Sequence, residues 1–120
     1  MKIAVSATGN TLDSDLDARF GRAACFIVVN PEDLSFEVVE NTQNLNAAQG
    51  AGIQAAKTVA DQGVDAVLTG NCGPKAYAVL EQAKIPVITG LSGSVKQAVE
   101  QYKKGGLAAA AGPNVNGHWM

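Results

Sequence analysis

The second half of the chain alternates helical patterns with short apolar runs, and this alternation constrains the fold more than any other feature. Apolar residues recur at helical spacing over residues 53–60, 76–83 and 95–102. Two short β-rich runs, 64–69 and 85–89, lie between those patterns. Strands that alternate with helices in this way are parallel and are joined by right-handed crossovers. A parallel sheet is therefore expected in this half.

The first half indicates a different connection between strands. Residues 2–7 form a short apolar run that stops at Thr8-Gly9-Asn10, as expected of a buried strand. Residues 24–30 and 35–40 flank a Pro31-Glu32-Asp33 turn, which is the pattern of an antiparallel hairpin. The sequence thus predicts an α/β fold with one mixed, mostly parallel sheet that is covered by helices.

Capping signals indicate where the helices begin. Asn46 and Gln49 have the spacing of a capping box, and so do Ser94 and Gln97. Pro74 suits the first position of a helix, because its missing N–H is not needed there. Three helices are therefore expected to begin near these points.

The composition is that of one folded domain spanning residues 1–120. Hydrophobic residues make up 47% of the 120-residue chain and charged residues 17%, which excludes intrinsic disorder. No run approaches the roughly 20 apolar residues of a membrane span, and the opening run turns polar at Ser6, too soon for a signal peptide. Two cysteines form no disulfide framework, so a cytoplasmic location is expected. A formal net charge of −2 argues against a general nucleic-acid binder, so neither nucleic acid nor a membrane is an expected partner.

The turn Gly70-Asn71-Cys72-Gly73-Pro74 is the first candidate site. A glycine-rich turn that leaves a parallel strand and opens a helix directs backbone N–H groups and the positive helix end at one point. That point favours an anion, and it lies at the carboxyl end of a strand, where open α/β sheets bind ligands. The Cys72 thiol is expected to have a lowered pKa there and to act as a nucleophile or a soft-metal ligand. The alternative is that the glycines only form the turn and that Cys72 fills space.

The segment Arg19-Phe20-Gly21-Arg22 is the second candidate site. Two arginines beside an aromatic ring make a compact cationic patch, and the planar, weakly hydrated guanidinium group suits large polarisable anions. The alternative is a solvated loop that binds nothing.

A third candidate is Gly50-Ala51-Gly52, within the first turns of a predicted helix. Each glycine inside a helix costs up to about 1 kcal/mol relative to alanine. That cost suggests the close approach of a ligand or of another backbone segment. Loose helix packing is the alternative.

Three further features carry weaker signals. Asp13, Asp15 and Asp17 alternate like the start of a calcium loop, but the glycine and the glutamate that such a loop needs are missing, so we expect a solvated acidic loop. Cys25 lies in an apolar run and is expected to be an inert core thiol with a raised pKa. His118, the single histidine, lies in the tail, where it is either solvated or folded over a metal site.

The sequence lacks the residue combinations of familiar enzymes. It contains no Cys-x-x-Cys motif, and one histidine can supply neither a histidine pair at metal spacing nor a credible Ser/His/Asp set. The predicted strands carry almost no acids, which excludes a two-metal nuclease. These absences favour a binding protein over an enzyme.

Several short motifs follow one another in a set order along nearly the whole chain. They are Phe20-Gly21-Arg22, Phe26, Asn41, Gly50-Ala51-Gly52, Gly63-Val64-Asp65, Gly70-Asn71-Cys72-Gly73-Pro74, Ile85-Pro86-Val87, Tyr102 and Gly105-Gly106-Leu107. Each motif is weak alone, but the ordered set is specific. Together the motifs resemble the dinitrogenase iron–molybdenum cofactor-binding family.

This resemblance implies both a fold and a function. The implied fold is ribonuclease H-like, with a five-stranded mixed sheet whose second strand is antiparallel to the rest and with helices on both faces. The implied function is non-enzymatic binding or carriage of a preassembled metal–sulfur cluster. The short single-domain members that this chain most resembles imply a mixed molybdenum–copper sulfide cluster without covalent attachment. A molybdenum–iron–sulfur cluster is the alternative.

One departure from the family pattern concerns position 19. Many relatives have a histidine directly before Phe-Gly-Arg, where this chain has Arg19. A histidine–metal bond is therefore not expected there. The arginine favours electrostatic capture of an anionic cluster instead.

We accordingly expect a cleft between the Arg19–Arg22 loop, the Gly50–Gly52 helix start and the Gly70–Pro74 turn. In this cleft the arginines supply charge, and the helix N-termini donate N–H groups to sulfide. Phe20 is expected to shield one face of the cluster from water. Cys72 is the residue expected to contact the metal directly, through copper.

The resemblance also implies a monomer with a protein partner, in cluster delivery or in complexes for cell division or metal homeostasis. Two other functions stay open at this point. A thiol enzyme would use Cys72 as a nucleophile at a helix N-terminus. Alternatively, the protein is a purely structural partner of a larger metalloenzyme, and the glycine turns then have no functional role.

Overall fold

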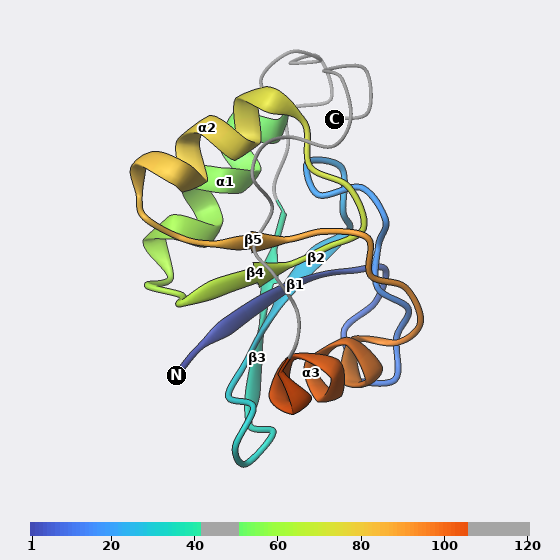
Figure 1. Cartoon of the computed structure of the whole chain (residues 1–120). Helices are drawn as coiled ribbons and strands as arrows, with labels where there is room; N and C mark the ends of the chain where they lie inside the picture. The colour runs from blue at the N-terminus through green and yellow to red at the C-terminus, as the bar shows by residue number, and fades with distance from the viewer. Residues whose placement is uncertain (42–50, 106–120) are drawn as a thin grey trace.

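The computed structural model describes residues 1–41 and 51–105, which form a five-stranded sheet and three helices (Figure 1). The strands are β1 (Ile3–Ala7), β2 (Cys25–Val29), β3 (Phe36–Glu40), β4 (Ala66–Leu68) and β5 (Val87–Ile88). The helices are α1 (Ala51–Asp61), α2 (Pro74–Gln82) and α3 (Val95–Lys104). The elements follow the predicted order. The predicted cap at Asn46 and Gln49 lies outside the described residues.

The strand order across the sheet is β3-β2-β1-β4-β5. β1 pairs parallel with β4, and β4 pairs parallel with β5. β2 pairs antiparallel with both β1 and β3, so it runs against the other strands of the described sheet. The hairpin pairs Cys25 with Glu40 at one end and Val29 with Phe36 at the other. These pairings confirm the expected mixed sheet with an antiparallel second strand.

The sheet is buried on both faces, which explains why its central strands read as continuous apolar runs. α1 and α2 cover one face and α3 covers the other (Figure 1). Along β1, Ala4 faces the α1/α2 core, whereas Ile3 and Val5 face the α3 core. The expectation of helices on both faces is therefore confirmed.

The helix ends follow the predicted signals where they are described. Pro74 occupies the start of α2, and Ser94 with Gln97 forms the predicted capping box of α3. α1, α2 and α3 all begin at the edge where the parallel strands end (Figure 1). We call this side of the sheet its carboxyl edge. Within residues 1–41 and 51–105, no helix combines the length and the apolar character needed to cross a membrane.

The loop that follows β1 agrees with its prediction only in part. Asp13 and Asp15 are exposed, as expected of a solvated acidic loop, but Leu16 is buried and the Asp17 side chain is only 12% exposed. The Asp17 N–H donates to the Ser6 carbonyl oxygen at 2.8 Å, and the Leu16 N–H donates to the Gly93 carbonyl oxygen at 2.8 Å. The loop is thus bonded between β1 and the start of α3, because its buried backbone groups need partners.

Candidate functional site

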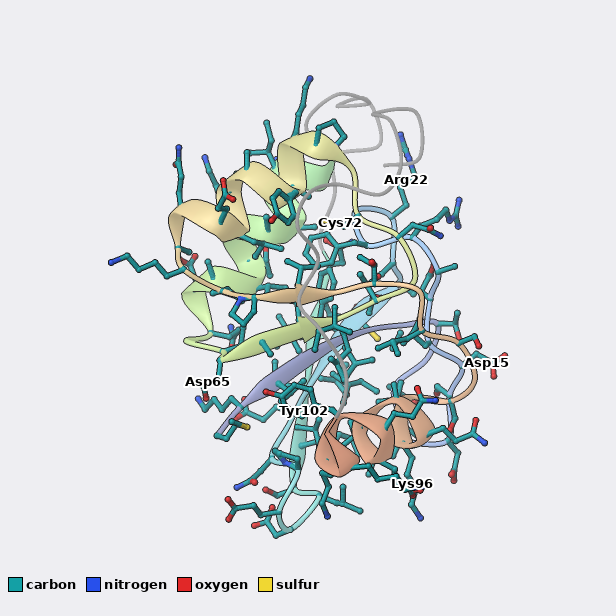
Figure 2. All side chains as sticks on the ribbon, in the orientation of Figure 1. Asp15, Arg22, Asp65, Cys72, Lys96 and Tyr102 are labelled. Carbon is teal, nitrogen blue, oxygen red and sulfur yellow. The ribbon has the colours of Figure 1, made fainter. Side chains whose placement is uncertain are left out.

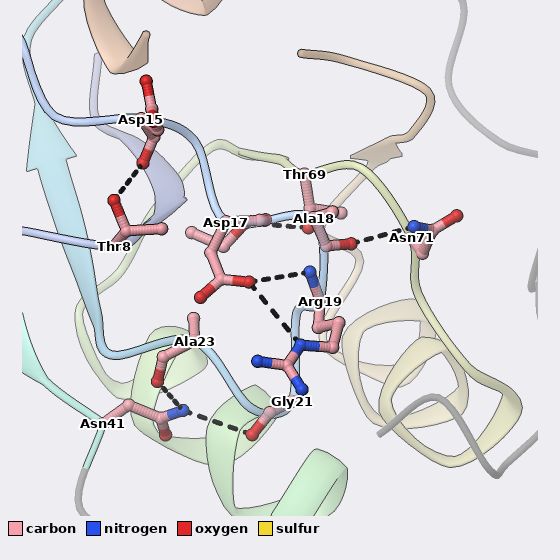
Figure 3. A network of polar contacts seen from close by, with 11 residues as sticks. Thr8, Asp15, Asp17, Ala18, Arg19, Gly21, Ala23, Asn41, Thr69 and Asn71 are labelled. Atoms are coloured by element: carbon pink, nitrogen blue, oxygen red, sulfur yellow. Dashed lines mark hydrogen bonds and ion pairs between the residues drawn. The ribbon is translucent and has the colours of Figure 1, made fainter. Parts of the chain in front are cut away.

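Two of the three predicted site segments are in direct contact at the carboxyl edge. Arg19 and Asn71 form a parallel bridge, and the Phe20 N–H donates to the Asn71 carbonyl oxygen at 3.2 Å. The Asn71 side-chain amide donates in turn to the Ala18 carbonyl oxygen at 3.0 Å (Figure 3). The Arg19–Arg22 loop and the Gly70–Pro74 turn therefore form one surface.

Gly70 permits this close approach of two backbones. A Cβ atom at position 70 would lie 2.8 Å from the Ala18 Cα and 3.0 Å from the Ala18 carbonyl oxygen. Real Cβ atoms do not approach backbone so closely, so this site needs glycine. The close approach explains why glycine stands at position 70, and the predicted anion site at this turn stays a prediction.

A buried polar network below this surface was not predicted. The Ser6 hydroxyl donates to the Asp17 carbonyl oxygen at 2.7 Å and is hydrogen-bonded to the Thr69 hydroxyl at 2.8 Å. Ser6 and Thr69 are both fully buried. The network ties the ends of β1 and β4 to the loop that carries Arg19. A serine and a threonine at the ends of two adjacent strands were the signal in the sequence.

Arg19 has a partial counter-charge of its own. Asp17 Oδ1 accepts a hydrogen bond from the Arg19 backbone N–H at 3.0 Å and lies 3.9 Å from Arg19 Nε (Figure 3). The Arg19 side chain is 52% exposed, so water screens this long ion pair. Arg22 is exposed as well and extends from the carboxyl edge (Figure 2). Both guanidinium groups are accessible to an anion.

The start of α2 adds positive potential beside these arginines. α2 has no acidic residue in its first turn, and Lys75 follows Pro74 there, exposed to solvent. Acidic side chains are normally favoured at that position, because the helix dipole is positive at its N-terminus. We call Arg19, Arg22, Lys75 and the N-terminus of α2 the cationic edge. The start of α3 differs, because Asp15 forms a backbone bridge with Ser94 and brings negative charge there.

Phe20 does not lie on the surface where it was expected to shield a ligand. Its side chain is 1% exposed, and its ring centroid lies 5.1 Å from that of Phe26 at an interplanar angle of 42°. It packs in the core between the sheet and α1/α2. The aromatic ring anchors the loop, and a surface role for it is wrong, because burying a phenylalanine ring is strongly favourable.

Cys72 also differs from its prediction. A lowered pKa was expected from the helix N-terminus, but the side chain is fully buried and burial raises the pKa of the thiol to about 12. Desolvation penalises the thiolate more than the helix end stabilises it. Its Sγ lies 3.7 Å from the Gly73 carbonyl oxygen, a contact that suits the protonated thiol. Cys72 is therefore a neutral thiol at physiological pH.

Cys25 behaves as predicted. It is buried, and its Sγ lies 3.1 Å from the Gly9 carbonyl oxygen. Burial raises the pKa of this thiol, and the negative charges of Glu40 and Asp17 raise it further. Within the described part of the chain, no group of three or more His, Cys, Asp or Glu side chains could hold a metal ion.

Part of the third predicted segment lies outside the described residues. Gly50 and the tail residue His118 are not described, whereas Ala51 is the first residue of α1 and Gly52 is buried in it. Whether Gly50–Gly52 completes a cleft with the cationic edge therefore stays a prediction.

Asn41 is a positioning residue that was visible in the sequence only as part of the ordered motifs. Its side-chain amide donates to the Gly21 carbonyl oxygen at 3.2 Å and to the Ala23 carbonyl oxygen at 2.8 Å (Figure 3). These bonds fix the turn from which Arg22 projects. Asn41 Oδ1 is buried and has no hydrogen-bond partner among the residues described.

Comparisons with known proteins agree with this fold. The apo orange protein from Desulfovibrio gigas superposes with a TM-score of 0.86 at 44% identity, over 95% of this chain and 96% of that one. A putative NifB protein from Thermotoga superposes with a TM-score of 0.72 at 26% identity, over 90% and 91% of the two chains. An uncharacterized protein from Methanocaldococcus jannaschii is 34% identical over 110 residues, which is 89% of each chain.

The family model described as "Dinitrogenase iron-molybdenum cofactor" matches residues 1–105. That range contains β1 to β5, α1 to α3 and the whole cationic edge. The resemblance found in the sequence motifs is confirmed by this match, and the chain belongs to the dinitrogenase iron–molybdenum cofactor family.

Proposed function

We propose that this protein binds and carries a preassembled, anionic metal–sulfur cluster at the cationic edge, without catalysing a reaction. The observation that carries the proposal is a helix start without first-turn acids, bordered by Arg19, Arg22 and Lys75. Such a helix start favours anions, and guanidinium groups suit large, weakly hydrated ones. Membership of the family and the similarity to the orange protein support the binding of a metal-cluster cofactor.

The donor groups fit a cluster that already carries its own sulfide ligands. Cys72 is buried and protonated, and the described residues contain no ligand set for a bare metal ion. A sulfide-saturated cluster needs positive charge and N–H donors rather than side-chain ligands. A mixed molybdenum–copper sulfide cluster is the cargo we propose, and a molybdenum–iron–sulfur cluster is the alternative.

Each part of the cationic edge has a distinct role in this proposal. Arg19 and Arg22 neutralise the charge of the cluster. The first backbone hydrogen bond of α2 runs from the Tyr77 N–H to the Gly73 carbonyl oxygen. The N–H groups of Lys75 and Ala76 precede this bond, so helix geometry leaves them without an acceptor inside α2. Ala76 is fully buried, so of these two groups it is the N–H of the exposed Lys75 that can donate to sulfide. Cys72 would contact copper only if its thiol lost its proton and the residues that bury it moved away.

The wider setting is part of the same proposal. We propose that residues 1–120 form one cluster-binding domain of ribonuclease H-like architecture, which the strand order and the antiparallel β2 support. Buried, reduced cysteines support a cytoplasmic location. We further propose a monomer that passes its cluster to a protein partner, in delivery or in cell-division or metal-homeostasis complexes.

Reconstitution tests the proposal directly. Purified protein is mixed with Cu(I) and tetrathiomolybdate, desalted, and analysed for metals and for visible charge-transfer bands. We expect molybdenum and copper to remain with the protein after desalting. Loss of all colour and metal would contradict cluster binding.

A matched pair of variants locates the site. Arg19→Ala with Arg22→Ala should reduce cluster retention at least tenfold and make the remainder more sensitive to salt, because charge attraction is screened. Lys103→Ala with Lys104→Ala removes the same charge at the far end of α3 and should change retention little. Equal losses in both double variants would show that only net charge matters.

The Cys72→Ser variant separates this proposal from the thiol enzyme. Non-covalent capture predicts a loss of cluster of no more than a few-fold. Complete loss would indicate that the thiolate is a ligand. The raised pKa of Cys72 argues against a nucleophile, since the thiolate is the reactive form.

A further inference from the structure

We propose that β3 is a docking site for an extended, basic segment of a partner protein, which adds to the sheet as a new strand antiparallel to β3. This inference does not depend on the proposed cluster. It concerns the side of the molecule where the hairpin of β2 and β3 lies (Figure 1).

The two edges of the sheet are protected very differently. β5 has two residues, both buried, and Pro86 precedes it. β3 has five residues, and its pairing with β2 runs without a bulge from Cys25↔Glu40 to Val29↔Phe36. Shortness, proline, bulges and charged side chains are the usual means of preventing a further strand from pairing. β5 has the first two, whereas β3 has only the charges of Glu37 and Glu40.

The hydrogen-bond pattern shows which backbone groups of β3 point outward. The Asn30 N–H donates to the Ser35 carbonyl oxygen at 2.8 Å, so this pair is a hydrogen-bonded one. Hydrogen-bonded pairs alternate along an antiparallel ladder. Glu37 and Val39 therefore bond to β2, whereas Phe36, Val38 and Glu40 direct their N–H and C=O groups away from it. A docked strand would pair with these three residues.

Apolar side chains lie beside these outward backbone groups. Phe36 is 41% exposed and Val38 is 36% exposed, and their strand positions place both on the α3 side of the sheet. With Met1, they are the large apolar side chains that are exposed in the described part of the chain. An open groove of about 320 Å³ adjoins Phe36 and Met1; it is lined by Met1, Lys2, Val28, Val29, Asn30, Ser35, Phe36 and Glu37.

Charge decides which occupant fits this edge. Glu32, Asp33, Glu37 and Glu40 all lie on the hairpin. The cations beside it are Lys2, which lines the groove, and the N-terminal ammonium of Met1, which acts on Asp33, so the four acids outnumber them. Hydrogen bonds from the Ser35 N–H and hydroxyl lower the pKa of Asp33, which keeps it ionised. A second copy of β3 would bring the same acids against this edge, whereas a basic segment complements them.

The register specifies the chemistry of the docked strand. Residues opposite one another in an antiparallel pair share a face of the sheet. Basic side chains are therefore required opposite Glu37 and Glu40, and apolar ones opposite Phe36, Val38 and Val39. The docked strand runs from opposite Glu40 to opposite Phe36, so its sequence from the N-terminus is Lys-Val-Val-Lys-Val.

A labelled peptide with this core, flanked by glycines, tests the proposal on cluster-free protein. We expect saturable binding by fluorescence anisotropy, with NMR amide shifts centred on residues 36–40. We also expect slower hydrogen exchange at the N–H groups of Phe36, Val38 and Glu40. No saturation at about 1 mM peptide, or shifts centred elsewhere, would overturn the proposal.

Two controls separate strand pairing from simple charge attraction. Glu37→Lys should weaken binding about tenfold, whereas Glu81→Lys, the same change at an exposed site on α2, should not. A peptide that is N-methylated at alternate residues keeps its charge but cannot pair, and it should not bind. Equal binding of this peptide, or equal effects of the two substitutions, would overturn the proposal. Failure here would leave the reconstitution result unaffected.

Discussion

The cationic edge and the hairpin side of β3 have opposite electrostatic characters within a chain whose formal net charge is only −2. The first gathers Arg19, Arg22 and Lys75 beside a helix N-terminus without first-turn acids. The second carries four acids and, from residue 23 to 56, the sequence has no basic residue at all. A net charge near zero is therefore compatible with two surfaces of opposite charge that favour different ligands. One suits an anionic cluster, and the other suits a basic peptide.

The two regions also use their aromatic residues differently. Phe20 lies next to an arginine but is buried against Phe26, whereas Phe36 lies next to a glutamate and is 41% exposed. In the cationic edge the ring holds a loop in place. At β3 the ring remains available for contact with a partner.

The largest expected effect distinguishes these two rings. Phe20→Ala should lower the free energy of unfolding by about 3–5 kcal/mol, because it leaves a cavity in the α1/α2 core. Phe36→Ala should lower it by less than about 1 kcal/mol, since its ring is partly solvated already. Denaturant unfolding of both variants measures the difference. Similar losses for both would contradict the assignment of Phe20 to the core.

A smaller effect is expected from the close approach at the cationic edge. Gly70→Ala would push a methyl group into the Ala18 backbone, which should cost about 1–3 kcal/mol and displace the arginine loop. Cluster retention should therefore fall together with stability. Gly63→Ala is the control. Gly63 has a positive φ of 67°, so this substitution also costs stability, but Gly63 lies away from the loop. The interpretation would be wrong if the Gly63 variant lost its cluster to the same extent.

Charge reversals at the two surfaces test whether each surface binds its ligand independently of the other. Arg22→Glu should reduce cluster retention about tenfold and leave binding of the basic peptide unchanged. Glu37→Lys should do the reverse, because each charge acts mainly within a Debye length of about 10 Å at 0.1 M salt. Both variants are assayed for both ligands. A reversal that affected both ligands equally would mean that the two surfaces are not independent.

The last effect is confined to alkaline pH and concerns the pH dependence of stability. The pKa of Cys72 is about 12 in the folded protein and near 9 when the chain unfolds. The stabilisation linked to the protonated thiol is fully present below pH 9 and is lost as the pH rises toward 12. Stability should fall above pH 9 by at most about 1.4 kcal/mol per pH unit. Cys72→Ala should flatten this slope, and an unchanged slope would show that other groups cause it.

Much of the fold was predictable from local pattern. The hairpin, the alternation of β4, α2, β5 and α3, and the Ser94–Gln97 capping box all follow from residue spacing within short windows. The glycine-rich turn and the arginine pair that meet at the carboxyl edge were visible as short motifs, and their role as a binding site stays a prediction. Spacing records local geometry, so it predicts elements and turns reliably.

The errors have one physical cause. Desolvation depends on neighbours that are distant in sequence, and no short window contains them. The helix N-terminus beside Cys72 was visible in the sequence, but the burial that raises its pKa was not. Asp17 and Phe20 were misplaced for the same reason, since contacts with Ser6, Asn71 and Phe26 order their loop.

The order of the strands and helices, the candidate motifs and the family follow from residue type and spacing alone. The tertiary structure is needed to establish which motif residues face solvent and which lie in the core. It brings Arg19 to Asn71 across 52 positions of sequence and places the acidic hairpin strand β3 at the edge of the sheet that the described residues form. Packing decides both outcomes, since burial of apolar side chains is non-directional and is settled only when the whole sheet and its helices assemble.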